Sequence, residues 1–292
     1  MLYKIVCDGA CDLPENYITE NDISVVPCYC SVDDNSYPSV EFDIKKVYQY
    51  MIEEDKYIST SMPNVQDYLS VFEENLKNNI SIICICMSSK LSGSYQSAMI
   101  AKSMLEESKF EGSVYIIDSQ VDTVVQGLVV QECVEMVKER LSIDIILQKI
   151  AMIIESIRCY FCVDEIKYLL KGGRARGILD ICNNRIKIKP ILTINHGEHQ
   201  LLAVSRGNNK AIQKMCRYIR EYFEVVDECP QDYRWCIGMG INENDAIELK
   251  ELVEQTIGVE LDIEIQRIGV VVAAHTGPYL MGVAFVKKYK KY

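Results

Sequence analysis

The sequence predicts an α/β protein, with a parallel strand–helix domain in its N-terminal half and an α+β domain in its C-terminal half. The apolar run Ile80–Met87 is typical of a strand that is buried on both faces of a parallel sheet. Strand patterns alternate with helical patterns up to about residue 158, as they do in doubly wound sheets. Beyond that point, Asn195–Glu198 separates two strand patterns and indicates a β-hairpin. We therefore expect two domains, residues 1–158 and 159–292.

The N-terminal domain is expected to alternate strands and helices along the chain. Asp12–Pro14 opens the first helix, because proline is tolerated in a first turn. A later helix starts after Pro63-Asn64, and its apolar residues follow Val65 at i+3, i+4, i+7 and i+11, which makes one amphipathic stripe. The other expected elements are strands at residues 2–6, 23–30, 80–87 and 114–117 and helices near residues 98–105 and 130–141.

The C-terminal domain is expected to combine hairpins with helices. Its strand patterns cover residues 186–194, 200–205, 235–239, 261–267, 269–274 and 281–286, and its helical patterns lie near residues 211–219 and 246–255. The sequence has no internal repeat and no low-complexity linker, so we expect the two domains to pack together.

The charge balance argues against some classes of function. The chain has 292 residues, with 31 Lys and Arg against 42 Asp and Glu, and a net charge of −11. General binding to nucleic acid or to an anionic membrane needs a basic surface, so neither partner is expected. No apolar run approaches the roughly 18 residues of a membrane helix, and Met1–Asp8 reaches a charge too early for a signal peptide. We expect a cytoplasmic protein without stable membrane anchoring.

The thirteen cysteines are expected to be core residues. Many lie inside apolar runs, such as Cys84 and Cys86 among isoleucines, and a reduced cysteine packs as a small hydrophobic side chain. The Cys-x-x-Cys pair Cys159–Cys162 has no second pair and no nearby histidines at ligand spacing. The sequence therefore predicts no metal site and no cofactor.

Ser88–Gln96 is the strongest candidate for a ligand site. It follows the strand at 80–87 and precedes a helix, and open α/β sheets bind ligands beyond the carboxyl ends of their strands. Its four serines and one glycine offer hydrogen-bond donors and close backbone approach, and helix N-termini attract anions. The alternative is that Ser92 or Ser94 only caps the helix. A nucleophilic serine is not expected, because the Gly-x-Ser-x-Gly pattern is absent here.

Two further turns carry candidate groups. Ser59–Pro63 also precedes a helix start. Its hydroxyls either cap that helix or converge, along one edge of the sheet, with those of Ser88–Gln96, here called the serine turn. His275 ends an apolar run and enters Thr276-Gly277-Pro278, a turn that can present a side chain to a cleft; the alternative is a structural histidine. His196 and His199 lie around the hairpin turn and are expected to be exposed to solvent.

Lys171–Lys189 concentrates positive charge, with six Lys and Arg residues against one Asp in 19 residues. Such a run is usually a solvated face. However, the Gly172-Gly173 pair lets the backbone turn sharply and bring Arg174 to an anion, and a guanidinium can make a forked contact to carboxylate or phosphate. The functional alternative is a docking surface for an acidic or phosphate-bearing partner.

Taken in order along the chain, these segments resemble the DegV family of bacterial fatty-acid-binding proteins. Each motif alone is weak, but the ordered set spans nearly the whole chain. The matching segments are Asp8–Pro14, Val25–Pro27, Ser61–Pro63, Ser88–Ala98, Ile117–Ser119, Lys171–Arg174, Lys189–Ile191, Arg206-Gly207 with Lys210, and His275–Pro278.

The resemblance implies a carrier that holds a long-chain fatty acid in the cleft between and inside its two domains. It further implies that a separate ATP-dependent fatty acid kinase converts the bound acid to an acyl-phosphate for phospholipid synthesis, with Arg174 serving phosphate transfer or partner docking. The chain itself then has no catalytic residue, and it has no Walker-A loop of its own. The carboxylate-binding positions carried over are Thr60, Ser61, Ser92, Ser94 and His275.

Two positions depart from the family pattern. Gly9 stands where the family commonly has serine, so the resemblance implies no hydroxyl from the first turn. Tyr279 stands where a glycine is usual, so the resemblance does not determine the shape of the pocket mouth. An alternative from another class is a phosphotransferase-type enzyme of a related fold, which would use His275 covalently on a small polar substrate. A carrier with a non-lipid ligand is a third possibility.

Overall fold

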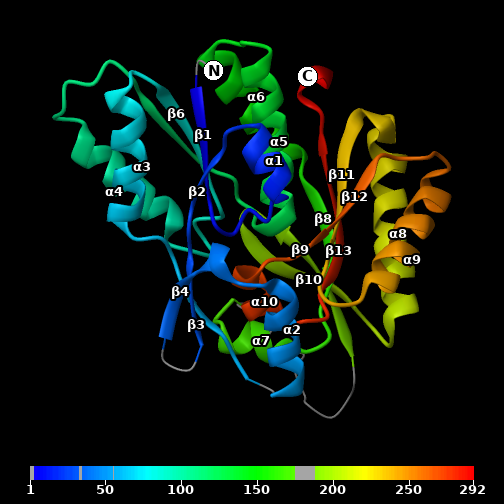
Figure 1. The fold of residues 1–292 in the computed structure, drawn as a ribbon. Coiled ribbons are helices and arrows are strands. Elements are labelled where there is room, and N and C mark those ends of the chain that lie inside the picture. The colour runs from blue at the N-terminus through cyan, green and yellow to red at the C-terminus, as the bar shows by residue number, and fades with distance from the viewer. Residues whose placement is uncertain (1–2, 33–34, 55, 175–187) are drawn as a thin grey trace.

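The computed structural model describes residues 3–32, 35–54, 56–174 and 188–292. Within these residues the chain forms three sheets, and the first is parallel throughout (Figure 1). The apolar strand β6 lies inside this sheet, between β1 and β7. The strand order is β2–β1–β6–β7, with β1 at Tyr3–Asp8, β2 at Ser24–Val26, β6 at Ser81–Cys86 and β7 at Val114–Asp118.

The second sheet has six strands in the order β10–β9–β8–β13–β11–β12. β11 and β12 are parallel, and the other pairs are antiparallel. β9 and β10 form the predicted hairpin around His196 and Gly197. Together with the parallel first sheet, this confirms the predicted α/β fold class. The strands are β8 Arg158–Cys162, β9 Lys189–Asn195, β10 Glu198–Ser205, β11 Tyr233–Met239, β12 Ile263–Arg267 and β13 Met281–Lys287.

A small antiparallel sheet, in the order β4–β3–β5, arises where the sequence predicts one strand at residues 23–30. That strand is divided, because Pro27 has no N–H for the ladder and separates β2 from β3. β5 pairs with β3 and thereby holds the segment that carries Thr60. The strands are β3 Tyr29–Val32, β4 Asn35–Pro38 and β5 Ser59–Ser61.

Helices cover the sheets and fill the space between them (Figure 1). α3 and α4 pack on the first sheet, and α8 and α9 pack on the second. α5 lies between the two sheets and contacts β1 and β6 on one side and β11 and β13 on the other. The α-helices are α1 Glu15–Glu20, α2 Ile44–Glu53, α3 Val65–Lys77, α4 Ser94–Leu105, α5 Thr123–Lys138, α6 Ile143–Ser156, α7 Ile166–Lys171, α8 Asn208–Val226, α9 Glu243–Ile257 and α10 Val270–Thr276. Single 3-10 turns occupy Ser39–Glu41, Pro230–Asp232 and Tyr289–Lys291.

The central position of α5 follows from its composition. Fourteen of its sixteen residues are buried, and a helix that is apolar nearly all round is stable only inside a core. Its buried Glu132 is paired, since Arg234 of β11 lies 2.6 Å away and the Tyr289 N–H donates to the same carboxylate at 2.7 Å. The partners compensate the cost of burying a charge between the sheets.

The sequence predicts a strand at residues 269–274, and this prediction is wrong. Val270–Thr276 forms α10, and its valines and alanines are buried. A short apolar run has the same appearance in a buried strand and in a buried helix, so periodicity cannot separate the two. Here the Gly269 N–H donates to Asp12 Oδ2 at 2.8 Å and starts the helix.

The cysteines that the structure describes are free thiols, and all of these twelve except Cys229 are buried. Burial raises the pKa of Cys133 to about 12, so such thiols stay protonated at neutral pH. This agrees with the prediction that they pack as core residues; Cys182 lies outside the described residues. In the part of the chain that the structure describes, no helix is long and apolar enough to cross a membrane.

The first prediction concerns the start of α3. Asn64 Oδ1 accepts the Asp67 N–H at 3.0 Å, and Asp67 Oδ2 accepts the Asn64 N–H at 2.8 Å, which completes a capping box. Asn64→Ala should lower the free energy of unfolding by about 1 kcal/mol, measured by urea denaturation. Gln66→Ala, on the exposed face of the same helix, is the control and should have no comparable effect.

Candidate functional site

Residues from four distant segments meet around one cavity, here called the polar cavity, which encloses about 620 Å³ of empty space when the part open to solvent is included. Thr60 and Ser61 reach it from β5, and Ser92 reaches it from the turn between β6 and α4. His275 comes from α10, and Arg174 follows α7. The fold therefore brings together four of the five positions that the resemblance assigns to a carboxylate, together with the arginine assigned to phosphate.

Ser94 is the fifth position, and it lies elsewhere. Its hydroxyl is fully buried, donates to Asp8 Oδ2 at 2.6 Å and lies 2.7 Å from the Tyr68 hydroxyl. Asp8 also accepts the Met87 N–H at 2.8 Å. Burial raises the pKa of Asp8, and the hydrogen bond from Ser94 is the largest effect that opposes it. Ser94 thus supports the carboxyl end of β1 and the serine turn beside it.

His275 is oriented by Thr60, whose Oγ1 lies 2.7 Å from Nε2 of the ring. Nδ1 is buried and has no hydrogen-bond partner among the described residues. Burial lowers the pKa of His275 to about 4, and the nearby positive charge of Arg174 acts in the same direction. The ring is therefore neutral at physiological pH.

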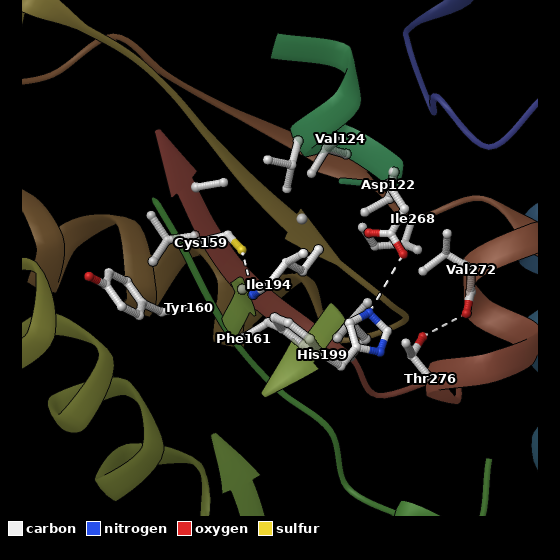
Figure 2. Close-up of a pocket in the computed structure, with 17 residues that line it drawn as sticks. Asp122, Val124, Cys159, Tyr160, Phe161, Ile194, His199, Ile268, Val272 and Thr276 are labelled. Atoms are coloured by element: carbon white, nitrogen blue, oxygen red, sulfur yellow. Dashed lines mark hydrogen bonds and ion pairs between the residues drawn. The ribbon is translucent and has the colours of Figure 1, made fainter. Parts of the chain in front are cut away.

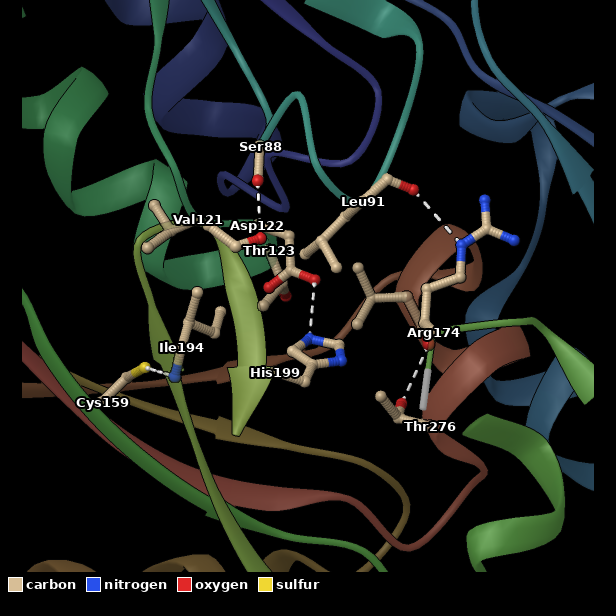
Figure 3. Close-up of polar contacts among 12 residues, drawn as sticks. Ser88, Leu91, Val121, Asp122, Thr123, Cys159, Arg174, Ile194, His199 and Thr276 are labelled. Carbon is tan, nitrogen blue, oxygen red and sulfur yellow. Dashed lines mark hydrogen bonds and ion pairs between the residues drawn. The ribbon is translucent and has the colours of Figure 1, made fainter. Parts of the chain in front are cut away.

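The two glycines before Arg174 have separate roles. Gly172 packs against the His275 ring so closely that an added Cβ would lie 2.2 Å from Nδ1, so no side chain fits there. Gly173 has φ of +71°, which favours glycine. The turn aims Arg174 back over the cavity, where Nε donates to the Leu91 carbonyl at 3.2 Å (Figure 3). NH1 donates to the Gly172 carbonyl. Through these two hydrogen bonds, Arg174 connects the Gly172-Gly173 turn to the serine turn.

A second, mainly apolar cavity, here called the apolar cavity, adjoins the polar one, and Figure 2 shows residues that line it. The two share Asp122, His199, Val272 and Thr276 in their walls. Apart from that junction, the apolar cavity is enclosed mainly by the first turn of α5, by strands of the second sheet and by α10. Its apolar walls include Val124, Val125, Phe161, Ile268, Leu280 and Val283.

Sequence reasoning missed two residues at the junction, Asp122 and His199. The sequence predicts that His196 and His199 are both exposed, and this is wrong for His199, which is 6% exposed. Its Nε2 lies 3.8 Å from Asp122 Oδ2 (Figure 3). A signal existed in β10, where His199 shares the inward face with Leu201 and alternates with exposed Glu198.

The two departures from the family pattern have simple structural outcomes. At Gly9, an added Cβ would lie 2.6 Å from Ser39 Oγ and 2.8 Å from the Cys28 nitrogen, so Ser39 occupies the space that a side chain would need. Tyr279 is not among the residues that line either cavity. Neither departure removes a group from the polar cavity.

The polar cavity adjoins an outer cavity of about 850 Å³ that has Lys90, Arg174 and Glu198 in its walls. The hairpin turn closes onto this region, because Ser88 Oγ donates to the Gly197 carbonyl at 2.7 Å. Of the predicted basic run Lys171–Lys189, residues 175–187 lie outside the described residues, including Arg176, Arg185 and Lys187. In the described part of that run, Arg174 is the cation that lines the outer cavity.

The second prediction concerns pH. The folded state lowers the pKa of His275 from 6.5 to about 4, so the unfolded chain binds more protons between these values and stability rises with pH there. The contribution lost on acidification is on the order of 2–3 kcal/mol. His275→Gln should flatten the rise in urea midpoint between pH 4 and 6.5, while exposed His196→Asn should leave it unchanged. Identical pH profiles for wild type and His275→Gln would contradict the assignment.

Comparison with known proteins agrees with this architecture. The family model described as "Uncharacterised protein, DegV family" matches residues 3–288. A DegV domain-containing protein of Clostridium acetobutylicum is 33% identical over 289 residues, which cover 98% of this chain and 99% of that protein.

Two solved structures extend the comparison. A stearic acid-binding protein from Eubacterium ventriosum is 31% identical, covers 99% of this chain and 100% of its own, and superposes with a TM-score of 0.93. A DegV lipid-binding protein from Thermotoga maritima is 26% identical, with coverage of 98% and 99% and a TM-score of 0.85. The match over almost the whole length, in sequence and in fold, shows that this chain belongs to the DegV family.

Proposed function

We propose that this protein binds a long-chain fatty acid, with the carboxylate in the polar cavity and the acyl chain in the apolar cavity. The observation that carries the proposal is that a cavity lined by hydroxyls shares part of its wall with a cavity lined by valine, isoleucine and leucine. The relatives from Eubacterium ventriosum and Thermotoga maritima are described as binding stearic acid and lipid, which supports the same class of ligand.

The acyl chain would supply most of the affinity. Burial of a methylene is worth about 0.8 kcal/mol, so a palmitate-length chain gains on the order of 10 kcal/mol before ordering costs are subtracted. The net affinity is much smaller, because ligand and side chains lose freedom on binding.

The head group would fix the orientation of the ligand. A carboxylate cannot enter a dry cavity without hydrogen-bond donors, and Thr60, Ser61 and Ser92 offer three hydroxyls. We infer that the His275 ring carries its proton on Nε2 and donates it to Thr60 Oγ1. The Thr60 hydroxyl proton is then free to point at the carboxylate. Nδ1, packed against Gly172, remains an acceptor, which is less costly to leave unpaired than a donor.

We also propose that the protein presents the carboxylate to a separate ATP-dependent fatty acid kinase, which forms an acyl-phosphate for phospholipid synthesis. Arg174 supports this role, because it lines both the polar cavity and the outer cavity and could contact a phosphoryl group arriving from outside. On this proposal, catalysis belongs to the partner.

A covalent role for His275 is less well supported. A nucleophilic histidine needs one ring nitrogen open to the substrate. Here Nε2 is engaged by Thr60 at 2.7 Å, and Nδ1 faces Gly172 without room for a carbon atom between them.

The direct test is denaturing extraction of the purified protein, followed by mass spectrometry of the released small molecules. We expect a long-chain fatty acid in roughly one-to-one ratio with protein, or binding of added fatty acid by protein that was stripped of lipid. A protein that is empty and also ignores added fatty acids would refute the proposed function.

The third prediction separates head-group binding from structural support. Ser92→Ala should weaken fatty acid binding several-fold and cost less stability than Ser94→Ala, since Ser92 lines the polar cavity and its hydroxyl accepts only the Ser94 N–H, at 3.2 Å, among the described residues. Ser94→Ala should show the opposite pattern, because its hydroxyl serves the buried Asp8, and removal should cost about 1–3 kcal/mol of stability. Calorimetric titration and urea denaturation measure the two effects. Equal loss of affinity in both variants would contradict this division of roles.

The fourth prediction concerns the kinase step. Arg174→Lys keeps the charge but loses the forked guanidinium, so acyl-phosphate formation by the partner kinase should slow more than tenfold. Fatty acid content after extraction should be close to that of wild type. A variant that is phosphorylated at the normal rate would argue against a role for Arg174 in phosphate transfer.

A further inference from the structure

The wall shared by the two cavities contains one polar pair, Asp122 and His199 (Figure 2). Both side chains are more than nine-tenths buried, at 8% and 4% exposure. Asp122 precedes the first turn of α5, and His199 points inward from β10, where its ring lies edge-on to Phe161 at 5.5 Å between centroids. The pair therefore lies where a bound chain would pass from the polar cavity into the apolar one.

Part of the hydrogen-bonding capacity of this pair is unused among the described residues. His199 Nδ1 is buried and has no partner in the described part of the chain. The 3.8 Å between Nε2 and Asp122 Oδ2 is too long for a hydrogen bond, so the two groups interact only as charges or dipoles.

Three other polar groups in the walls of the apolar cavity have partners within the protein. The Thr276 hydroxyl donates to the Val272 carbonyl at 2.9 Å, and the Thr123 hydroxyl donates to Asp12 at 2.6 Å. Cys159 Sγ accepts the Ile194 N–H at 3.3 Å. Next to these satisfied groups, His199 Nδ1 is a buried polar atom at the junction without a partner in the described part of the chain.

The backbone holds Asp122 in place. Thr123 has φ of +48°, a conformation that β-branched residues rarely adopt, and its hydroxyl is tied to Asp12. A strained turn persists only where surrounding contacts fix its conformation, as the hydrogen bond to Asp12 does here. The carboxylate at the junction is accordingly part of a fixed site.

We propose that the preferred ligand is a long-chain fatty acid that carries a hydroxyl group on its chain, and that Asp122 and His199 bind this hydroxyl. The inference rests on the proposed function. A hydroxyl can donate its one proton to the Asp122 carboxylate and, at the same time, accept from a ring N–H of His199. An oxo group only accepts, and a plain methylene would cover both polar groups without replacing their lost water. Since the pair borders the polar cavity, the hydroxyl belongs on the carboxyl-proximal part of the chain.

The experiment is competition binding on lipid-stripped wild-type protein, with a fluorescent fatty acid displaced by octadecanoic acid, its positional hydroxy isomers and the matching oxo acids. One carboxyl-proximal hydroxy isomer should bind at least about tenfold more tightly than octadecanoic acid, and the oxo acid should fall between them. If no hydroxy isomer exceeds the plain acid, the inference is refuted while the proposed function stands. If no acid binds at all, the proposed function fails with it.

Variants assign the preference to the pair. In the double variant Asp122→Val with His199→Leu, the dissociation constants of octadecanoic acid and of the preferred hydroxy isomer should become equal, so that their ratio falls to about one. His196→Asn, in the exposed turn of the same hairpin, is the matched control and should keep the wild-type ratio. Thermal unfolding checks that each variant is folded. If the double variant does not fold, the same binding comparison is made with the milder variant His199→Gln. An unchanged preference in a folded double variant or in His199→Gln would overturn the assignment to Asp122 and His199.

Discussion

The Asp12 carboxylate fixes the two helices on which both cavities depend. It accepts the Thr123 hydroxyl at 2.6 Å at the start of α5 and the Gly269 N–H at 2.8 Å at the start of α10. α5 supplies Val124 and Val125 to the apolar cavity, and α10 carries His275. Burial raises the pKa of Asp12 to about 7, although both hydrogen bonds oppose the shift. Gly269 is required as well, since an added Cβ would lie 2.1 Å from Asp12 Oδ1.

The position of the cavities follows from the packing of α5 between the sheets. Beyond the two parallel-sheet strands that it contacts, the helix is held against the second sheet by the Glu132–Arg234 pair. The first turn of α5 lines the apolar cavity together with α10 and strands of the second sheet. Gly238 lets Ile268 approach closely in the same wall, since an added Cβ would lie 2.6 Å from the Ile268 side chain.

The sequence was sufficient for features with a local or periodic cause. Buried β6, the β9–β10 hairpin and the capped start of α3 each have such a signal. Convergence of Thr60, Ser92 and His275 followed from an ordered set of motifs. The failures depended on tertiary contacts: α10 was indistinguishable from a strand by periodicity. Alternation in β10 signals the inward orientation of His199, but its place beside Asp122 depends on tertiary packing, and the binding of Ser94 to Asp8 needs two strands placed side by side.

The contact between Ser88 Oγ and the Gly197 carbonyl joins the two sheets directly at the cavities. Gly197 has φ of +85° and leaves only 2.6 Å between a would-be Cβ and Ser88 Oγ, so the hairpin seats closely on the serine turn. Leu91 and His199, on the two sides of this contact, both line the polar cavity. Two walls of the polar cavity, one from each sheet's connecting turn, therefore owe their spacing to a single hydroxyl and a single glycine.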